Sequence, residues 1–247
     1  MRHDFDTAIT AITVDLDDTL YAQSAYLAGA WEAVAAAAVG AGVEEDTAEV
    51  LRLALTEVAS EGSDRGRIID RALHRCGLPG ELVPVLVDSF LAHRPRHLVL
   101  HPGVPEALGR LRERFPVAIV TDGDPRIQRA KIAALGLESM VDTIVVSDEL
   151  GGRHHRKPSP TPLLEALDRF GVLPESAVHV GDRPGKDTAA ALAAGMRAIR
   201  VRCGEYAEQP DDPQPWLSCA DFPAAVAALL AAAPEPDLPV TLSVKYR

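Results

Sequence analysis

The sequence predicts an α/β fold, with a doubly wound parallel sheet and an inserted module made only of helices. Three observations support this prediction. Short β-branched runs alternate with helical patterns along most of the 247 residues. These runs are almost wholly apolar, as expected of parallel strands that are covered on both faces. One long interval, between Leu20 and Leu100, contains helical patterns and no convincing strand.

The alternating part of the chain accounts for the sheet and its covering helices. Glycines at 136, 171 and 195 stand where helix C-caps are expected. Strand–helix alternation of this kind is typical of a doubly wound sheet. We expect strands at Ile9–Val14, Val117–Val120, Thr143–Val146, Ala177–Val180 and Ala198–Val201, and helices at Val104–Arg114, Arg126–Leu135, Thr161–Phe170, Asp187–Ala194 and Phe222–Ala232.

The interval without strands predicts a separate helical domain. Residues 1–20 and 100–233 would form the catalytic core, and residues 21–99 the inserted domain. Residues 234–247 would be a tail, in which the alternation over Val240–Tyr246 fits an edge strand, a contact arm or disorder. Within the insertion we expect helices near Ala25–Val39, Asp46–Ser60, Arg65–Cys76 and Glu81–Ala92.

Composition and charge exclude several classes of function. The net charge of −11 argues against binding to nucleic acid or to an anionic membrane, because the chain lacks a basic field. The three cysteines are far apart and form no C-x-x-C pair, which fits a reducing cytoplasm and argues against a zinc site. The polar N-terminus has no signal-peptide pattern, and the apolar run Ala33–Val39 is too short to span a membrane.

The first candidate site follows the first expected strand. Asp15 and Asp17 stand one residue apart where the run Ile9–Val14 ends. Paired carboxylates suit two tasks, which are holding a hard divalent cation and dividing the work of nucleophile and general acid. Acidic residues also end strands in solvated turns, so this pair alone leaves both interpretations open.

Two further features stand where later strands are expected to end, at the edge of an α/β sheet where ligands bind. Thr121, Asp122 and Gly123 offer a hydroxyl and backbone N–H groups to a phosphoryl oxygen, although the same tripeptide forms ordinary turns. Lys157 is one of four lysines beside 21 arginines. Its compact ammonium could neutralise a carboxylate and the phosphate that this carboxylate attacks, and a solvated loop cation is the alternative.

The last feature is a second pair of carboxylates. Asp182 follows the strand Ala177–Val180, and Asp187 begins the next helix. With Asp15 and Asp17 they would complete an oxygen-rich site for Mg²⁺. Asp187 also suits a helix N-terminus, where its charge compensates the helix dipole, and the two interpretations are compatible.

Taken together and in this order, these residues resemble the four motifs of the haloacid dehalogenase superfamily of phosphohydrolases. The resemblance covers about residues 8–20 and 100–232, and it implies a Rossmann-like core. The insertion looks like the C1-type cap of that family, which closes over the site and selects substrates. The motifs are matched by Asp15 through Thr19 for D-x-D-x-T, by Thr121 and Lys157 for the single-residue motifs, and by Gly181, Asp182 and Asp187 for G-D-x-x-x-x-D.

The resemblance implies a Mg²⁺-dependent phosphatase. Asp15 would be the nucleophile that forms an aspartyl-phosphate, and Asp17 would protonate the leaving oxygen and then deprotonate water. Thr121, Asp122, Gly123 and Lys157 would bind the phosphoryl group. Mg²⁺ would be held by Asp15, the backbone carbonyl of Asp17 and Asp182, with Asp187 supporting through a hydrogen bond or a water.

One residue departs from the family pattern. The position after Thr121 is commonly Asn in such proteins, and here it is Asp122. An extra acid beside a phosphate is unfavourable unless it faces away, binds a substrate hydroxyl or is paired, and Arg183 and Lys186 are candidates for the pairing. The basic cluster formed by His154, His155 and Arg156 faces either the phosphate or solvent.

The residues present in the sequence favour or disfavour several activities known in the superfamily. A halide needs no proton on leaving, so Asp17 argues against a dehalogenase. Phosphonate hydrolysis through a Schiff base needs a cap lysine, and none occurs between Leu20 and Leu100. A phosphomutase uses the same carboxylates and needs basic cap residues, for which the candidates are Arg65, Arg67, Arg94, Arg96 and His97.

A catalytically silent binding or regulatory protein on the same fold is the alternative of another class. The expected partner is a small phosphorylated metabolite, either a sugar phosphate or nucleotide-like. Tyr21, Tyr26, Trp31 and the arginines of the insertion could line the entrance, and Tyr26 and Trp31 could instead pack the helices of the insertion. We expect a monomer or a homodimer.

Overall fold

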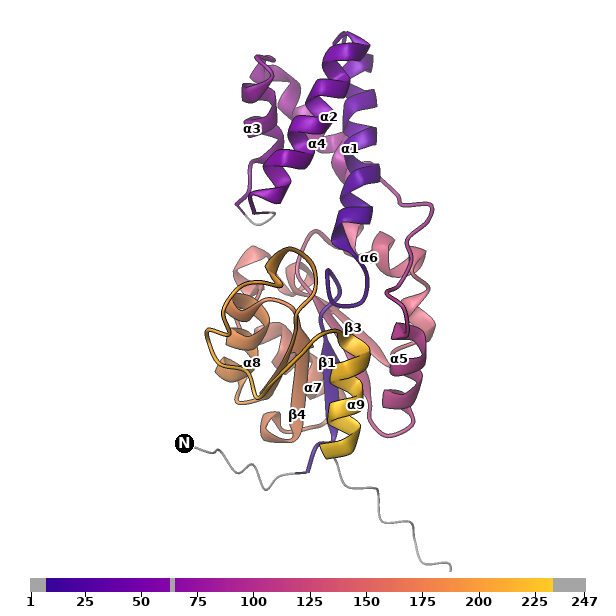
Figure 1. Cartoon of the computed structure of the whole chain (residues 1–247), viewed down its shortest axis with the longest axis vertical. Coiled ribbons are helices and arrows are strands. Elements are labelled where there is room, and N and C mark those ends of the chain that lie inside the picture. Colours follow the sequence, from indigo (N-terminus) through magenta and orange to yellow (C-terminus); the bar gives the residue numbers. More distant parts are fainter. Residues whose placement is uncertain (1–7, 63–64, 233–247) are drawn as a thin grey trace, which may run out of the picture.

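The computed structural model describes residues 8–62 and 65–232, and it confirms the predicted α/β core (Figure 1). Six strands form one parallel sheet in the order β3-β2-β1-β4-β5-β6. The strand order reverses between β1 and β4, so the carboxyl ends of these two strands flank the crevice where ligands bind in such sheets. The strands are β1 (Ala11–Val14), β2 (Val117–Thr121), β3 (Thr143–Val146), β4 (Ala177–Gly181), β5 (Arg197–Val201) and β6 (Leu217–Cys219).

Helices cover both faces of the sheet because successive strand residues point to opposite sides. Ile12 and Val14 pack on one face against α5 (Val104–Arg112), α6 (Pro125–Ala134) and α9 (Phe222–Ala232). Ala11 packs on the other face with α7 (Thr161–Phe170) and α8 (Ala189–Ala194). This double cover explains why the strands are apolar at nearly every position.

Four helices stand apart from the sheet, beyond the carboxyl ends of its strands (Figure 1). Their apolar faces form a core of their own, centred on Val34, Leu51, Leu55 and Leu86. Burial of each such side chain stabilises the folded state by about 1.5–3 kcal/mol. The helices are α1 (Gln23–Gly40), α2 (Glu45–Ser60), α3 (Ile68–Arg75) and α4 (Val83–Ala92).

The chain enters and leaves this helical group through two segments that lie side by side. Tyr21 forms a β-bridge with Leu100, and the backbone N–H of His101 donates to the carbonyl of Leu20 at 2.9 Å. The four helices are therefore joined to the core beside the end of β1.

Two elements differ from the sequence prediction. The edge strand β6 was not expected, because it has three residues and none of them is fully buried. The helix expected from Asp187 begins instead with a π-helical turn, Pro184–Thr188, before α8. The predicted tail, with its Val240–Tyr246 segment, lies outside the described residues, and so does the N-terminal segment before residue 8.

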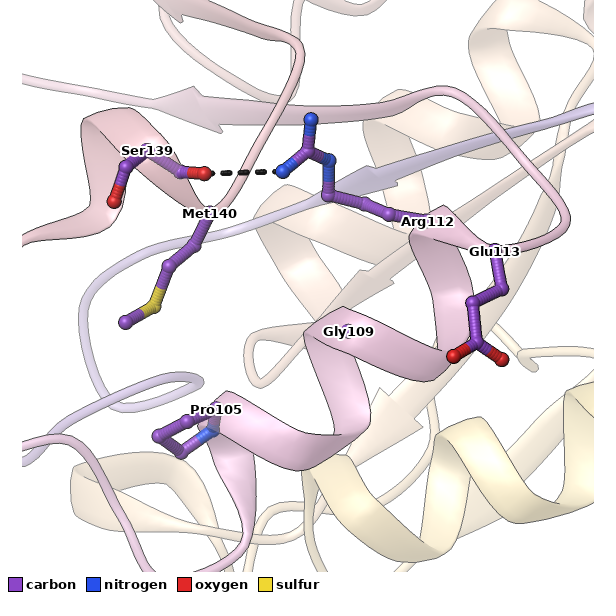
Figure 2. A pocket seen from close by; sticks show the side chains of 6 residues that line it. All are labelled: Pro105, Gly109, Arg112, Glu113, Ser139 and Met140. Atoms are coloured by element: carbon purple, nitrogen blue, oxygen red, sulfur yellow. Dashed lines mark hydrogen bonds between the residues drawn. The ribbon is translucent and has the colours of Figure 1, made fainter.

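A shallow hollow of about 370 Å³ lies between α5 and the segment around Met140 (Figure 2). Its cation Arg112 already donates to the carbonyl of Ser139 at 3.0 Å and pairs with Asp142 at 2.8 Å. Arg112 therefore joins α5 to this segment and is not a free cation. Within the described residues, no helix is long and apolar enough to cross a membrane.

Candidate active site

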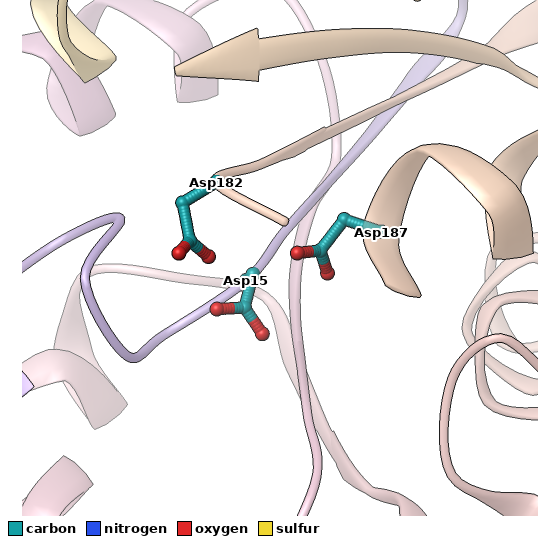
Figure 3. A group of neighbouring side chains, drawn as sticks. All are labelled: Asp15, Asp182 and Asp187. Carbon is teal, nitrogen blue, oxygen red and sulfur yellow. The ribbon is translucent and has the colours of Figure 1, made fainter. Parts of the chain in front are cut away.

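Three carboxylates meet at the point where the strand order reverses. Asp15 follows β1, Asp182 follows β4, and Asp187 lies in the π-helical turn beyond it. Figure 3 shows the three side chains turned toward one another, and one oxygen of each lies within 4.8 Å of the others. All three residues are buried. Asp15 precedes Asp182 and Asp187 by more than 160 residues in the sequence, and the parallel sheet brings the three together.

Lys157 binds two of these carboxylates. Its Nζ lies 2.5 Å from Asp15 Oδ1 and 2.6 Å from Asp187 Oδ1, and it also donates to the carbonyl of Val120 at 3.1 Å. The side chain of Lys157 is only 2% exposed. Burial lowers the pKa of Lys157, but Asp15 and Asp187 outweigh it and hold that pKa above its ordinary value. The ammonium therefore stays charged between the two carboxylates.

One ammonium does not balance three buried carboxylates. Burial raises the pKa of Asp15 to about 7 despite Lys157, and burial with the charge of Asp187 holds the pKa of Asp182 well above its usual range. Neither carboxylate oxygen of Asp182 has a hydrogen-bond partner among the described residues. Oxygen ligands with excess negative charge and unpartnered lone pairs are the donor set that a hard divalent cation prefers. The residues present therefore fit such an ion.

A chain of buried hydrogen bonds fixes the third carboxylate. His179, in β4, contacts Asp187 Oδ1 through Nε2 at 3.2 Å and the Thr13 hydroxyl through Nδ1 at 2.8 Å. Burial lowers the pKa of His179, so the ring is neutral. Since a carboxylate can only accept, Nε2 carries the proton and Nδ1 accepts from Thr13. His179 thus orients Asp187 toward Lys157.

Gly181 leaves room for Asp187, and this gives a first prediction. A Cβ at Gly181 would lie 2.6 Å from Asp187 Cβ, which is closer than atoms can approach. We expect Gly181→Ala to displace Asp187 from Lys157, to lower the free energy of unfolding by about 1–3 kcal/mol and to remove activity. The matched control is Gly185→Ala in the same segment, where a Cβ meets nothing within 4 Å. Equal denaturant midpoints and activities for the two variants would contradict this account.

Asp17 lies outside the carboxylate cluster and faces other partners. Lys131 Nζ, on α6, lies 2.8 and 3.0 Å from the two oxygens of Asp17. Gln128 Nε2 donates to Oδ2 at 3.0 Å, and the Tyr21 hydroxyl donates to Oδ1 at 2.5 Å. Burial raises the pKa of Asp17, but the charge of Lys131 and the hydrogen bonds from Lys131, Tyr21 and Gln128 together hold that pKa below its ordinary value. Asp15 and Asp17 are therefore served by separate lysines.

The residues after β2 lie beside the same cluster. The Thr121 hydroxyl accepts from Gln128 Nε2 at 2.5 Å, so one amide links Thr121 to Asp17. Asp122 Oδ1 accepts from the backbone N–H of Lys157 at 3.1 Å, whereas its Oδ2 is buried and has no hydrogen-bond partner among the described residues. Gly123 has φ +141°, a conformation that favours glycine.

The basic residues before Lys157 divide between an ion pair and the surface. Arg156 pairs with Asp148 at 2.6 Å. His154 is exposed and its ring lies 3.9 Å from that of His155. Arg153 and Arg156 line a cavity over the carboxylate cluster, and neither histidine is among the residues that line it.

A cavity of about 680 Å³ opens over the cluster, between the core and the helical group. Its core wall contains all the site residues predicted from sequence. Tyr26 and Trp31 of α1 both pack against Phe90 of α4 and line the cavity. Of the five cap residues considered for a mutase, Arg67 is the one that lines it.

Three residues that contact the site were not predicted from the sequence, and these are Gln128, Lys131 and His179. Tyr21, a candidate for the entrance, donates to Asp17. One usable signal existed for Lys131, since it is one of four lysines and shares a helix with the apolar residues Ile127 and Ile132. A charged residue within an apolar helical pattern is buried only when it is paired. His179 sat inside an apolar strand pattern and gave a similar signal.

A family comparison agrees with this geometry. The model of the haloacid dehalogenase-like hydrolase family matches residues 9–195, which is more than half of the chain. The chain therefore belongs to the haloacid dehalogenase-like hydrolases, and it is an enzyme of that class.

Two relatives of this chain are named as phosphatases. The chain is 38% identical over 203 residues to a glyceraldehyde 3-phosphate phosphatase of Methanopyrus kandleri, a match that covers 80% of this chain and 86% of the relative. It is 36% identical over 151 residues to a phosphoserine phosphatase of Thermus thermophilus, covering 61% of this chain and 59% of the relative.

Solved structures share the fold. A 2-haloacid dehalogenase from Pseudomonas syringae pv. tomato matches with a TM-score of 0.62 and 29% identity, covering 90% of this chain and 98% of the other. A putative β-phosphoglucomutase from Thermotoga maritima matches with a TM-score of 0.66 and 20% identity, covering 91% of this chain and all of the other. At that identity the second match concerns the fold alone.

Proposed function

We propose that the protein is a Mg²⁺-dependent phosphatase that hydrolyses a small phosphorylated metabolite through an aspartyl-phosphate on Asp15. The observation that carries the proposal is the position of the Asp15 carboxylate, which lines the cavity, binds the Lys157 ammonium and lies next to the carboxylates of Asp182 and Asp187. The site therefore brings together a nucleophile, a cation that can bind the phosphate, and ligands for a metal ion.

Asp15, Asp182 and the backbone carbonyl of Asp17 would hold Mg²⁺, and Asp187 would support it through a hydrogen bond or a water. The ion would supply positive charge to Asp15 and to the phosphoryl oxygens when bound. Asp182, with both oxygens buried and unpartnered, is the residue of this chain that most needs such charge.

The remaining side chains have roles that follow from their places. Lys157 holds Asp15 and, by the same ammonium, neutralises the phosphate that approaches it. The Thr121 hydroxyl and the backbone of Asp122 and Gly123 bind the phosphoryl oxygens. Asp17 protonates the leaving oxygen and then deprotonates the attacking water. The covalent intermediate on Asp15 splits one difficult step into two easier ones. Asp17 also argues against dehalogenation, since a halide leaves without a proton.

Residues 21–99 act as the cap in this proposal. The cavity between α1, α4 and the core suits a small metabolite such as a sugar phosphate or a nucleotide-like molecule better than a phosphoprotein. The named phosphatase relatives support the class of substrate. The net charge of −11 and the three free cysteines support a cytoplasmic enzyme, monomeric or dimeric, that binds neither nucleic acid nor membrane.

Phosphate release from a panel of sugar phosphates, nucleotides and phosphorylated small acids tests this proposal. We expect release with Mg²⁺, loss of release with EDTA, and recovery when Mg²⁺ is added back. Mg²⁺ should also raise the thermal unfolding midpoint of the wild type, because a ligand that binds only the folded state stabilises it. The Asp182→Asn variant should lose that rise.

Full activity in EDTA would overturn the metal assignment. If no compound releases phosphate but sugar phosphates isomerise in the same tubes, the enzyme is a mutase. A Mg²⁺-dependent rise of the unfolding midpoint without any turnover would favour the silent binding protein.

A further inference from the structure

Lys131 is a second buried lysine at the cavity, and its ammonium binds Asp17, whereas Lys157 binds Asp15 and Asp187. Its side chain is 4% exposed, and the acceptors that the structure records for Nζ are the two oxygens of Asp17. The ring of Tyr26, from α1, lies 4.6 Å from Nζ. Both residues line the cavity, with the apolar side chains of Leu27 and Phe90 nearby. The charge of Lys131 is thus balanced by one carboxylate in a largely apolar setting.

Asp17 cannot serve the leaving group and keep all of these partners. Lys131 donates to both of its oxygens, Tyr21 donates to Oδ1 and Gln128 to Oδ2. To contact the ester oxygen, one oxygen of Asp17 has to exchange a donor for the substrate. Lys131 then loses part of its only recorded counter-charge, and a buried ammonium without a partner is strongly unfavourable.

A second polar group belongs to Tyr26, whose ring contacts the Lys131 ammonium. The hydroxyl of Tyr26 is buried and has no hydrogen-bond partner among the described residues. Burial raises the pKa of Tyr26 to about 12, so the hydroxyl keeps its proton and can donate. An unpartnered donor on the ring that contacts the ammonium can take up an oxygen acceptor. In the function proposed above the phosphoryl group binds at Asp15 and Lys157, so this acceptor would belong to the leaving group.

We propose that Lys131, with the Tyr26 hydroxyl, binds a carboxylate or carbonyl oxygen of the leaving group and so selects the substrate. The preferred substrates are phosphate esters of small hydroxy acids, followed by those of hydroxy aldehydes, over phosphate esters of plain alcohols. A substrate carboxylate takes the place of the Asp17 carboxylate as the partner of the Lys131 ammonium. Asp17 is then free to contact the ester oxygen. This inference rests on the phosphatase function proposed above.

Three esters with one carbon skeleton test it. 3-Phosphoglycerate, glyceraldehyde 3-phosphate and glycerol 3-phosphate carry a carboxylate, an aldehyde and an alcohol at the same end. For the wild type we expect kcat/KM to fall in that order. In Lys131→Met the preference for the acid over the alcohol should shrink by a factor of about 10 to 100, the worth of one charge-assisted hydrogen bond. The ratio cancels any loss that the variant imposes on every substrate.

Companion variants separate selection from packing. Lys131→Arg should keep most of the preference, because the charge remains. Tyr26→Phe should reduce the preference severalfold, since the ring remains and the hydroxyl is lost. The control is Arg129→Met on the same helix, whose partner is the exposed Glu149 and which should leave the preference unchanged.

The outcomes are distinguishable. An equal loss of activity on all three esters in Lys131→Met would mean that Lys131 only positions Asp17, and would overturn the inference. A wild type that prefers the alcohol, or that hydrolyses p-nitrophenyl phosphate and none of the three esters, would also overturn it. No release from p-nitrophenyl phosphate or any ester would instead overturn the phosphatase function itself.

Discussion

Replacing Asp15 by Asn is expected to lower kcat by about four or more orders of magnitude while the protein stays folded. An amide is not a nucleophile, so the covalent phosphoryl intermediate cannot form. Asn has almost the same shape as Asp, and Lys157 keeps its ion pair with Asp187 at 2.6 Å, so the buried cluster retains a partner for its ammonium. Steady-state phosphate release and acid-quenched intact-mass measurements check the result.

The wild type should carry a phosphoryl adduct in the quenched sample, and Asp15→Asn should carry none. The control is Asp46→Asn on the exposed side of α2, which makes the same chemical change away from the site. Both variants should unfold at temperatures close to that of the wild type. Retention of more than a few per cent of activity, or an adduct on Asp15→Asn, would exclude Asp15 as the nucleophile.

The sequence was sufficient to predict that the carboxylates of Asp15, Asp182 and Asp187 lie together at one edge of the sheet. Asp15 and Asp182 follow apolar strands, and parallel strands place their carboxyl ends at one edge of the sheet. Strand and helix positions followed from the same patterns, because both faces of the sheet are buried and each strand is short and apolar. The edge strand β6 escaped because its three residues are only partly buried and carry no pattern.

The partners of Asp17 could not be predicted in the same way. Lys131 and Gln128 lie three residues apart on α6, so they share a face, but nothing local says which part of the sheet edge this face meets. That depends on how α6 packs beside α4 and the end of β1. The interaction of Lys131 with Asp17 spans 114 residues, and only the tertiary structure supplies it.

The two carboxylates of the first motif differ because of these partners. Burial raises the pKa of Asp15 to about 7, whereas at Asp17 burial is offset by Lys131 together with Tyr21 and Gln128, which hold the pKa of Asp17 below its ordinary value. The proposed chemistry needs the reverse, an ionised nucleophile and a protonated acid. The charge of Mg²⁺ would favour the ionised form of Asp15, and a substrate oxygen on Lys131 would release Asp17 from its counter-charge. Each carboxylate thus depends on a different ligand.

Replacing Asp17 by Asn is expected to slow the hydrolysis of alkyl phosphates by about 10²- to 10⁴-fold, the usual worth of a general acid. An alkoxide is a poor leaving group and needs a proton, whereas p-nitrophenolate leaves without one. The same variant should therefore lose much less activity on p-nitrophenyl phosphate. A comparison of kcat for the two classes of ester, measured at saturating Mg²⁺, checks the prediction.

The side chain of Asp17 contacts Lys131 and lies outside the cluster formed by Asp15, Asp182 and Asp187. The Mg²⁺ concentration that gives half-maximal activity should therefore be almost unchanged in Asp17→Asn. If the variant instead recovers full activity at high Mg²⁺, or loses equal activity on both classes of ester, Asp17 is not the acid. The proton would then have to come from another group that faces the leaving oxygen, because the groups that contact Asp15 bind the phosphate in the proposed function.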